Sequence, residues 1–266
     1  FKESGNVTDI VWIDLNEDDI LDAIVVGYWM PIKVFMNDGE KLTLQKNTQL
    51  QKTNGWWNSI KANDFDKDGD IDFIVGNWGL NTRLKATSDE PITLYSNDFD
   101  DNGTIDPVIT HFYQKQETPF ASKDELVKQI PFLNKKYLSY KDFANASFTD
   151  LFPKEKIYKA YKKQIFELGS SYFENLGNAT FKKHQLPFMA QISSVNDIAL
   201  DDYNNDGFMD VFLVGNNYNI NTQLGKLDAS HGIILLNNKI GFFDENLDQD
   251  FNISGEARNI EKLLIN

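Results

Sequence analysis

Four short segments of the chain carry most of its aspartates at a fixed spacing. Each follows the pattern D-x-[DN]-x-[DN]-G-x-x-D, with acidic or amide side chains at positions 1, 3, 5 and 9 and glycine at position 6. Of the 28 aspartates in the sequence, 17 lie in or directly beside these segments. The segments begin at Asp14, Asp64, Asp98 and Asp202, and only the first has Asp19 in place of the glycine.

This residue pattern is suited to a calcium ion. Calcium takes about 6–8 oxygen ligands, and a short acidic loop brings the oxygens at positions 1, 3 and 5 together. Glycine at position 6 permits the positive φ of a tight turn, and the carbonyl at position 7 and carboxylate at position 9 complete the set. Crowded carboxylates repel one another without a cation, so we expect two to four Ca²⁺ ions. The predicted ligands are Asp64, Asp66, Asp68, Asp70 and Asp72; Asp98, Asp100, Asn102, Thr104 and Asp106; Asp202, Asn204, Asp206, Phe208 and Asp210; and Asp14, Asn16, Asp18, Ile20 and Asp22.

Two other interpretations of the acidic segments were compared with a calcium loop. An EF-hand loop has glutamate at position 12 and lies between two helices. Position 12 is apolar in every copy here: Val25, Val75, Ile109 and Leu213. An isolated Asp-Gly cluster is also typical of a hairpin turn, but four copies favour metal binding. Whether the Asp14 segment holds metal stays open, because it lacks the glycine and carries Glu17.

Strand patterns flank the acidic segments. Apolar or alternating runs precede them, and β-branched runs that end in glycine follow, as in 23–27, 73–76 and 211–215. Runs of 4–8 such residues bounded by Gly, Asn and Asp are typical of strands. A further apolar strand with Asn and a Gly turn comes later in each unit. The unit therefore predicts a four-stranded antiparallel blade, and repeated blades form a β-propeller, an all-β fold.

These loops and their flanking strands resemble the VCBS / FG-GAP repeat, whose family includes the calcium-binding blades of integrin α-subunit heads. The resemblance covers about two thirds of the chain. It implies a β-propeller, an extracellular location, calcium in the loops and a role in adhesion or ligand binding. Further segments resemble large VCBS-repeat surface proteins of Bacteroidota, commonly secreted or outer-membrane lipoproteins; these are 27–31, 122–126, 171–175 and 225–230.

The repeats suggest three parts of the chain. We expect propeller blades over 1–114, a Lys-rich helical insertion over 115–168 and further blades over 169–266, the last one, from Glu256, incomplete. The chain then belongs to a larger ring of about seven blades, and a closed ring of four or five is the alternative. The Asp98 segment either opens a blade or lies on the turn between a third and a fourth strand.

The Lys-rich segment differs from the rest in charge and pattern. Residues 115–163 hold 11 Lys against 6 Asp and Glu, whereas the whole chain has a net charge of −14. Ser122 and Glu125 form a capping-box pattern before a helix, and short helices are expected over 132–140 and 154–166. The segment is either a solvated helical insertion or a docking surface for an acidic or protein partner.

A second candidate site follows the glycine that ends the second strand of three units. Aromatic rings beside amides suit carbohydrate or peptide ligands, and packing between blades is the alternative role. The residues of this expected ligand face are Trp29, Trp78, Asn81, Tyr218, Asn221 and Gln223.

Composition excludes several functions. The net charge of −14 argues against a nucleic-acid partner, and the absence of Cys removes thiol chemistry and thiolate metal sites. Without a run of 18 apolar residues, nothing is expected to span a membrane. From the acidic loops we expect a calcium-binding module, not an enzyme, and the family resemblance implies that it is part of a secreted or cell-surface bacterial protein. It would bind a protein or glycan in an outer-membrane uptake or adhesion assembly, with a transporter or lipoprotein as partner. The alternatives are a polysaccharide lyase or glycosidase on such a propeller, and a purely structural propeller.

Overall fold

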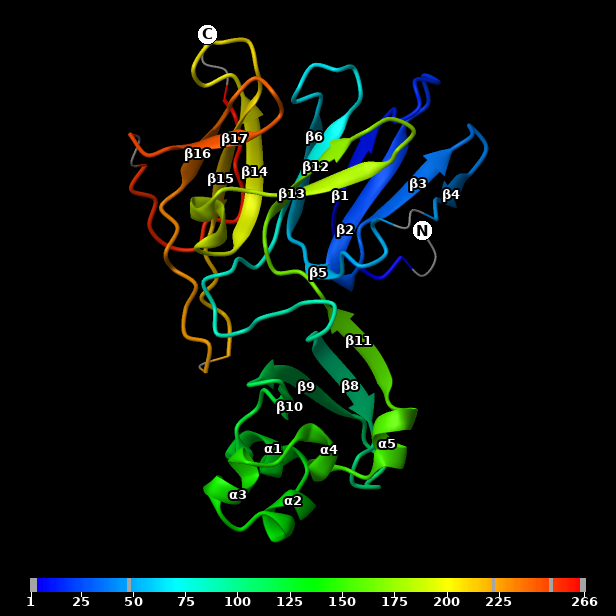
Figure 1. Cartoon of the computed structure of the whole chain (residues 1–266), viewed down its shortest axis with the longest axis vertical. Helices are drawn as coiled ribbons and strands as arrows, with labels where there is room; N and C mark the ends of the chain where they lie inside the picture. The colour runs from blue at the N-terminus through cyan, green and yellow to red at the C-terminus, as the bar shows by residue number, and fades with distance from the viewer. Residues whose placement is uncertain (1–3, 47–48, 222, 249–250, 264–266) are drawn as a thin grey trace. The chain divides into compact units, whose positions relative to one another are not determined.

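The structure, a computed structural model, describes residues 4–46, 49–221, 223–248 and 251–263 (Figure 1). The chain forms two compact units. Unit 1 comprises Phe1–Arg83 and Glu167–Asn266, and unit 2 comprises Leu84–Phe166. Unit 2 is therefore inserted into the sequence of unit 1.

Unit 1 contains three antiparallel sheets among its described residues, which we call blades 1 to 3. Blade 1 consists of β1 (Asn6–Ile13), β2 (Asp22–Met30), β3 (Lys33–Asn37) and β4 (Leu42–Leu44), with β5 (Gly55–Trp56) also paired to β2. Blade 2 consists of β6 (Ser59–Asn63), β7 (Asp72–Gly76), β12 (Ser171–Asn175) and β13 (Phe181–Gln185). Blade 3 consists of β14 (Val195–Asp201), β15 (Asp210–Gly215), β16 (Ile233–Asn237) and β17 (Phe243–Asn246), and a 3₁₀ helix, η1 (Phe188–Gln191), precedes it. The predicted all-β fold of four-stranded, propeller-like blades is confirmed.

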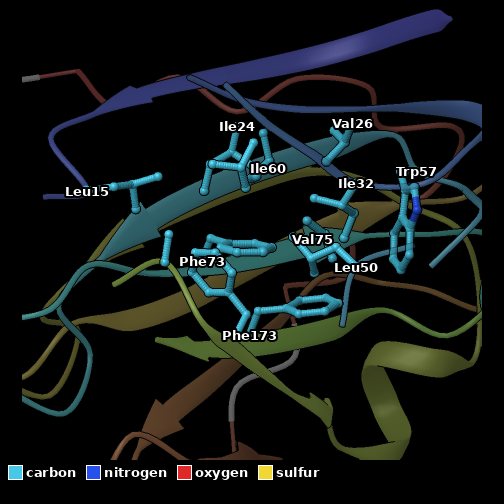
Figure 2. Packing of buried hydrophobic residues seen from close by; sticks show 13 residues of the cluster. Leu15, Ile24, Val26, Ile32, Leu50, Trp57, Ile60, Phe73, Val75 and Phe173 are labelled. Atoms are coloured by element: carbon cyan, nitrogen blue, oxygen red, sulfur yellow. The ribbon is translucent and has the colours of Figure 1, made fainter. Parts of the chain in front are cut away.

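In blade 2, β7 is buried on both faces because it packs between residues of blades 1 and 3. All five residues of β7 are buried. Phe73 and Val75 join a core cluster with residues of blade 1, whereas Ile74 joins a second cluster with residues of blade 3. Figure 2 shows the first of these clusters, in which Phe73 and Val75 lie beside Ile24 and Val26 of β2. This double burial explains why the sequence of β7 is continuously apolar instead of alternating.

A repeated hydrogen bond joins the first strands of successive blades. In each case a side chain six residues before the acidic loop donates to a backbone carbonyl just before β6, at the start of β14 or in the segment after blade 3. The bonds are Thr8 Oγ1 to Trp57 O (2.7 Å), Asn58 Nδ2 to Val195 O (2.9 Å) and Asn196 Nδ2 to Ala257 O (2.8 Å). The first strands β1, β6 and β14 therefore lie next to one another, as around the axis of a propeller.

The segment after blade 3 takes part in the same pattern. Asp9 in β1 accepts a hydrogen bond from the backbone N–H of Ile60 (2.9 Å), and Asp197 in β14 accepts one from Ile260 (2.7 Å). Ala257 and Ile260 thus form the same two hydrogen bonds with β14 that Trp57 and Ile60 form with β1. The expected start of a further blade lies in this segment up to residue 263, and residues 264–266 lie outside the described part of the chain.

The strands of blade 2 come from two distant parts of the sequence. β7 pairs with β12 in the register Ser171↔Val75, Tyr172↔Ile74 and Phe173↔Phe73. Unit 2 occupies the chain between these strands. The irregular spacing of the acidic segments follows from this insertion.

Unit 2 combines a sheet with short helices. Its sheet has the order β10-β9-β8-β11, formed by β8 (Ile92–Asn97), β9 (Asp106–Tyr113), β10 (Gln116–Pro119) and β11 (Tyr161–Ile165). The helices are α1 (Lys123–Gln129), α2 (Phe132–Lys136), α3 (Tyr140–Ala144), α4 (Phe148–Leu151) and α5 (Lys154–Lys159). The predicted capping box of Ser122 and Glu125 is present at α1. A core that includes Tyr95 and Phe99 from the sheet and Leu126 and Phe148 from the helices holds the unit together.

Two sequence expectations differ from the structure of unit 2. The helix predicted over 154–166 was wrong in its second half, because α5 ends at Lys159 and residues 161–165 pair with β8 as β11. The compact unit also begins at Leu84, earlier than the expected insertion over 115–168. It begins there because β8 to β10 join β11 in one sheet. None of the helices in the described residues is long and apolar enough to cross a membrane.

Candidate metal centres

The four acidic loops share one backbone conformation. In each loop the position-1 carboxylate accepts the N–H of position 6, at 2.8 Å for Asp14, 3.2 Å for Asp64, 2.8 Å for Asp98 and 2.7 Å for Asp202. The position-5 side chain accepts the N–H of position 7 at 2.7–3.0 Å. Position 4 has a φ of +57° to +61° in every copy: Glu17, Lys67, Asp101 and Asn205. The loops are therefore copies of one structure as well as of one sequence pattern.

Asp19 keeps this conformation without the glycine. Its φ is +63°, whereas Gly69, Gly103 and Gly207 have φ values of +85° to +101°. Aspartate tolerates this left-handed region better than most residues because its short polar side chain bonds locally. The departure at position 6 therefore leaves the fold of the Asp14 loop intact.

The position-9 carboxylates fix the end of each loop. Asp22, Asp72, Asp106 and Asp210 are all at most 3% exposed. Each accepts the N–H of position 2 at 2.9–3.2 Å. In the three blades, each also accepts the N–H of an asparagine on the third strand, at 2.7 Å from Asn37, 2.7 Å from Asn175 and 2.8 Å from Asn237. These asparagines explain the strand, Asn and Gly-turn repeat in the sequence.

Two of the loops gather three carboxylates at metal-binding distance. Asp64, Asp66 and Asp72 each place one oxygen within 4.8 Å of the others, and so do Asp98, Asp100 and Asp106. Oxygen ligands lie about 2.3–2.6 Å from calcium, so two ligands across the ion are up to roughly 5 Å apart. Within the described residues, Asp64 Oδ1 and Asp100 Oδ1 are buried without a hydrogen-bond partner. A buried unpaired carboxylate oxygen is costly unless a cation satisfies it.

Electrostatics of the Asp64 loop also favour a cation. Burial raises the pKa of Asp66, and the neighbouring charges of Asp68 and Asp64 raise it further. Burial raises the pKa of Asp72 to about 7, although hydrogen bonds from Asn175, Tyr172 and Phe65 oppose that rise. Among the ion pairs of the described residues, none involves a carboxylate of this loop. The loop therefore holds excess negative charge that its own surroundings do not neutralise.

The raised pKa of Asp72 predicts a pH dependence. Without metal, the folded chain binds this proton between pH 3.8 and about 7 while the unfolded chain does not. Metal-free stability therefore falls as the pH rises through that window. Calcium requires the ionised carboxylate, so its affinity for the Asp64 loop should fall by up to about tenfold per pH unit below 7.

Calorimetric titration at pH 8, 7 and 6 checks this dependence. An Asp98→Ala variant removes the Asp98 loop from the titration, and an Asp64→Ala variant removes the Asp64 loop. Hydrogen bonds within the Asp98 loop lower the pKa of Asp98 against the opposing effect of desolvation. A calcium affinity of the Asp64 loop that does not change between pH 8 and pH 6 would contradict the assignment of Asp72.

The Asp98 loop differs from the Asp64 loop in its position and its charge. It joins β8 and β9, which are the first two strands of the unit 2 sheet in chain order and its two central strands in space. In blades 1 to 3 the acidic loop joins an edge strand to the strand beside it, whereas here both strands are central. The Lys156 ammonium donates to Asp98 O at 2.6 Å and also contacts the carboxylate of Asp101. A lysine thus supplies part of the positive charge that this loop requires.

Removing that lysine should strengthen calcium binding by the Asp98 loop. A divalent and a monovalent cation roughly 6 Å apart in water repel each other by about 1.4 kcal/mol, which is tenfold in affinity. We therefore expect Lys156→Met to raise the calcium affinity of this loop by about tenfold in calorimetry on the Asp64→Ala background. Lys159→Met is the matched control, since Lys159 lies on the same helix and pairs with Glu155. Equal affinities of the two variants would refute the role given to Lys156.

The Asp14 and Asp202 loops have asparagine at position 3. The Asn16 amide donates to Asp18 Oδ2 at 2.9 Å, and the Asn204 amide donates to Asp206 Oδ2 at 3.2 Å. Lys239 lies 3.4 Å from the same oxygen of Asp206. Three carboxylates are therefore not brought together in these two loops, and their ligand sets would rest on amide and carbonyl oxygens as well.

The structure gathers only part of the expected ligand face. Trp29 and Trp78 both contact Trp56, with ring centroids 5.4 Å and 5.0 Å apart. Asn81 donates to the carbonyl of Ile192 at 3.2 Å. The remaining expected residues, Tyr218, Asn221 and Gln223, lie in the loop of unit 1 that the Asn217–Leu227 bridge closes. Lys226 lies over the Tyr218 ring, and Asn221 Oδ1 accepts the N–H of Gln223.

Sequence reasoning missed Trp56 and a polar pocket of unit 1. The signal for Trp56 was available, because it lies in a Gly-Trp-Trp run just before β6. The pocket has a volume of about 310 Å³ and is lined by Tyr28, Asn58, Asn196, Asn217, Asn219, Glu256 and Arg258. Asn58 and Asn196 both lie six residues before an acidic loop, a repeat that marks them in the sequence.

Comparison with known families identifies part of the chain. Residues 14–75 match the model of the FG-GAP-like repeat. The match runs from the Asp14 loop through the Asp64 loop to β7, and it confirms the predicted repeat family for this stretch. No curated protein matches the chain.

Proposed function

From the FG-GAP-like repeat over residues 14–75, we propose that the chain is a calcium-binding β-propeller module that binds a protein or glycan ligand. Calcium is structural in this proposal. It neutralises the acidic loops and fixes the geometry of the strands that they join. The binding role rests on the loops at the opposite end of the blades, where aromatic and amide side chains gather.

The carboxylate cluster of Asp64, Asp66 and Asp72 supports the calcium proposal most strongly. It combines three oxygens within 4.8 Å of one another with a buried unpaired oxygen on Asp64. Hard oxygen ligands of this kind suit calcium or magnesium. Calcium is favoured because loop carbonyls and several carboxylates supply many ligands, whereas magnesium keeps most of its waters.

We place the module in a secreted or cell-surface protein of a bacterium. Extracellular modules bind calcium with dissociation constants of about 10⁻⁴–10⁻³ M, which only an outside compartment supplies. The resemblance to Bacteroidota surface proteins supports an outer-membrane lipoprotein or transporter assembly as the setting. The module would contribute there to nutrient capture or adhesion.

Calorimetric titration of the metal-free chain tests the calcium proposal. We expect two to four calcium ions per chain, with the tightest binding lost in Asp64→Ala. Magnesium at the same concentrations should bind at least tenfold more weakly, because it demands octahedral geometry and dehydrates reluctantly. Binding of less than one calcium per chain, or an unchanged isotherm for Asp64→Ala, would overturn the proposal.

A further inference from the structure

The polar pocket of unit 1 lies where the first strands of the blades meet. Asn58 directly precedes β6, Asn196 lies in the neighbouring β14, and Arg258 comes from the segment that continues the same pattern. Tyr28 is near the end of β2 away from the acidic loop. The pocket therefore opens at the ends of the strands opposite the candidate metal centres.

The floor of the pocket is a fixed network of amides. Tyr28 donates its hydroxyl hydrogen to Asn58 Oδ1 at 2.7 Å. The Asn58 amide donates to Ser194 Oγ and Val195 O, and the Asn196 amide donates to Asn216 O and Ala257 O. These bonds fix the orientation of both amides, so their oxygens and the phenol oxygen are held as acceptors with lone pairs to spare.

The rim of the pocket supplies polar groups that the hydrogen bonds of the fold leave available to a ligand. Asn219 is exposed, and its side-chain amide bonds to no other described residue. Asn217 Oδ1 accepts the N–H of Asn219 at 3.1 Å, which leaves the Asn217 amide hydrogens for a ligand. Arg258 pairs with Glu256 at 3.0 Å and has 67% of its side chain exposed. The two opposite charges cancel, so the pocket has no net charge for an ionic ligand.

A stacking surface lies next to this network. Trp56 is directly paired with Tyr28 in the β2–β5 register, and its ring contacts Trp29 and Trp78. Sugars present hydroxyl groups that both donate and accept hydrogen bonds and apolar ring faces that stack on aromatic rings. A volume of about 310 Å³ is at the lower end of the range for small-molecule sites and suits one or two sugar rings.

We propose that this pocket binds a neutral saccharide, with the floor amides and the Asn217 and Asn219 amides bonding its hydroxyls. The inference rests on the proposed role as a binding module and names its ligand class. A protein ligand is less suited to the site, because a small concave pocket of fixed amides fits a compact polyhydroxylated ring better than a polypeptide surface.

A glycan array of neutral, amino and acidic sugars, probed with the calcium-loaded chain, tests the proposal. Saturation-transfer NMR with the best neutral hit then gives its affinity, expected at a dissociation constant of about 1 mM or below. Asn219→Ala should weaken binding by roughly tenfold, the effect of losing a hydrogen bond of about 1.4 kcal/mol. Asn259→Ala is the matched control, because Asn259 is also exposed and lies beside Arg258 without lining the pocket.

Three results would overturn the proposal. These are the absence of any neutral glycan among the hits, equal binding by Asn219→Ala and wild type, and binding of galacturonate or phosphate that Arg258→Gln abolishes. Calcium-dependent melting is measured on the same samples. A chain that calcium stabilises but that binds no saccharide refutes this inference alone, whereas a chain that calcium does not stabilise refutes the calcium proposal independently of sugar binding.

Discussion

Chelation with EDTA is expected to lower the melting temperature of the chain by roughly 5–10 °C for each calcium ion lost. An ion present at 100 times its dissociation constant contributes about 2.7 kcal/mol to folding. For a domain of about 150–250 residues, each kcal/mol shifts the melting temperature by about 2–4 °C. The carboxylates at Asp64, Asp66 and Asp72 also repel one another once the ion leaves. Differential scanning calorimetry in EDTA and in calcium at 100 times the dissociation constant found by calorimetric titration measures the shift.

Titrating calcium back separates a specific effect from a general one. The melting temperature should recover with calcium at the concentrations that saturate the calorimetric isotherm, and an equal concentration of sodium chloride should not restore it. Units 1 and 2 each contain one three-carboxylate cluster, so two transitions should move. Superimposable melting curves in calcium and EDTA would show that the loops fold without metal.

Replacing Asp66 with asparagine should change stability in opposite directions with and without calcium. In EDTA the variant loses one charge from a crowded and partly buried cluster, so its melting temperature should rise by a few degrees. In calcium it loses a charged ligand, so its melting temperature should fall below that of the wild type. The backbone accepts the change, because Asn16 and Asn204 occupy the same position in loops of the same conformation.

The sign reversal is the informative result, since an ordinary destabilising substitution lowers stability in both buffers. Asp228→Asn serves as the control, because Asp228 is an exposed aspartate of unit 1 outside the acidic loops. Its effect should be small and the same in calcium and in EDTA. A lower melting temperature for Asp66→Asn in both conditions would mean that Asp66 stabilises the fold by itself and not through a cation.

The repeat made the local architecture predictable from the sequence. Each acidic loop lies between apolar runs, and in all four copies these runs form an antiparallel pair. The asparagine at the end of the third strand was also visible as a repeat, although its role in fixing the position-9 carboxylate required the structure. Local periodicity carries this information because a hairpin is formed by neighbouring residues.

Non-local pairing was not predictable in the same way. The sequence around Ser171 does not indicate that β12 pairs with β7. The two strands are almost a hundred residues apart, and unit 2 is inserted between them. The segment 161–165 has two lysines and one glutamine between a tyrosine and an isoleucine and was expected to be helical, yet its pairing with β8 decides its structure. Tertiary contacts of this kind override weak local propensity.

In the candidate site, too, the local pattern was predictable from the sequence and the non-local contacts were not. The spacing of Asp64, Asp66 and Asp72 predicted a common ligand set, and the structure brings those oxygens together. The part played by Lys156 in the Asp98 loop was not visible, because the lysine lies on a separate helix far along the chain. The pocket of unit 1 likewise joins residues of five separate segments, which only the arrangement of the blades brings together.

Anomalous diffraction from a crystal grown in calcium is the most direct measurement of the central claim. Calcium binding predicts an anomalous peak bounded by Asp64 Oδ1, Asp66 and Asp72, with oxygen ligands at about 2.3–2.6 Å from the ion. The buried oxygen of Asp64, which bonds to no other described residue, should be among those ligands. Strong diffraction without an anomalous peak in this loop, or with only water at hydrogen-bonding distances of about 2.8 Å, would contradict calcium binding there.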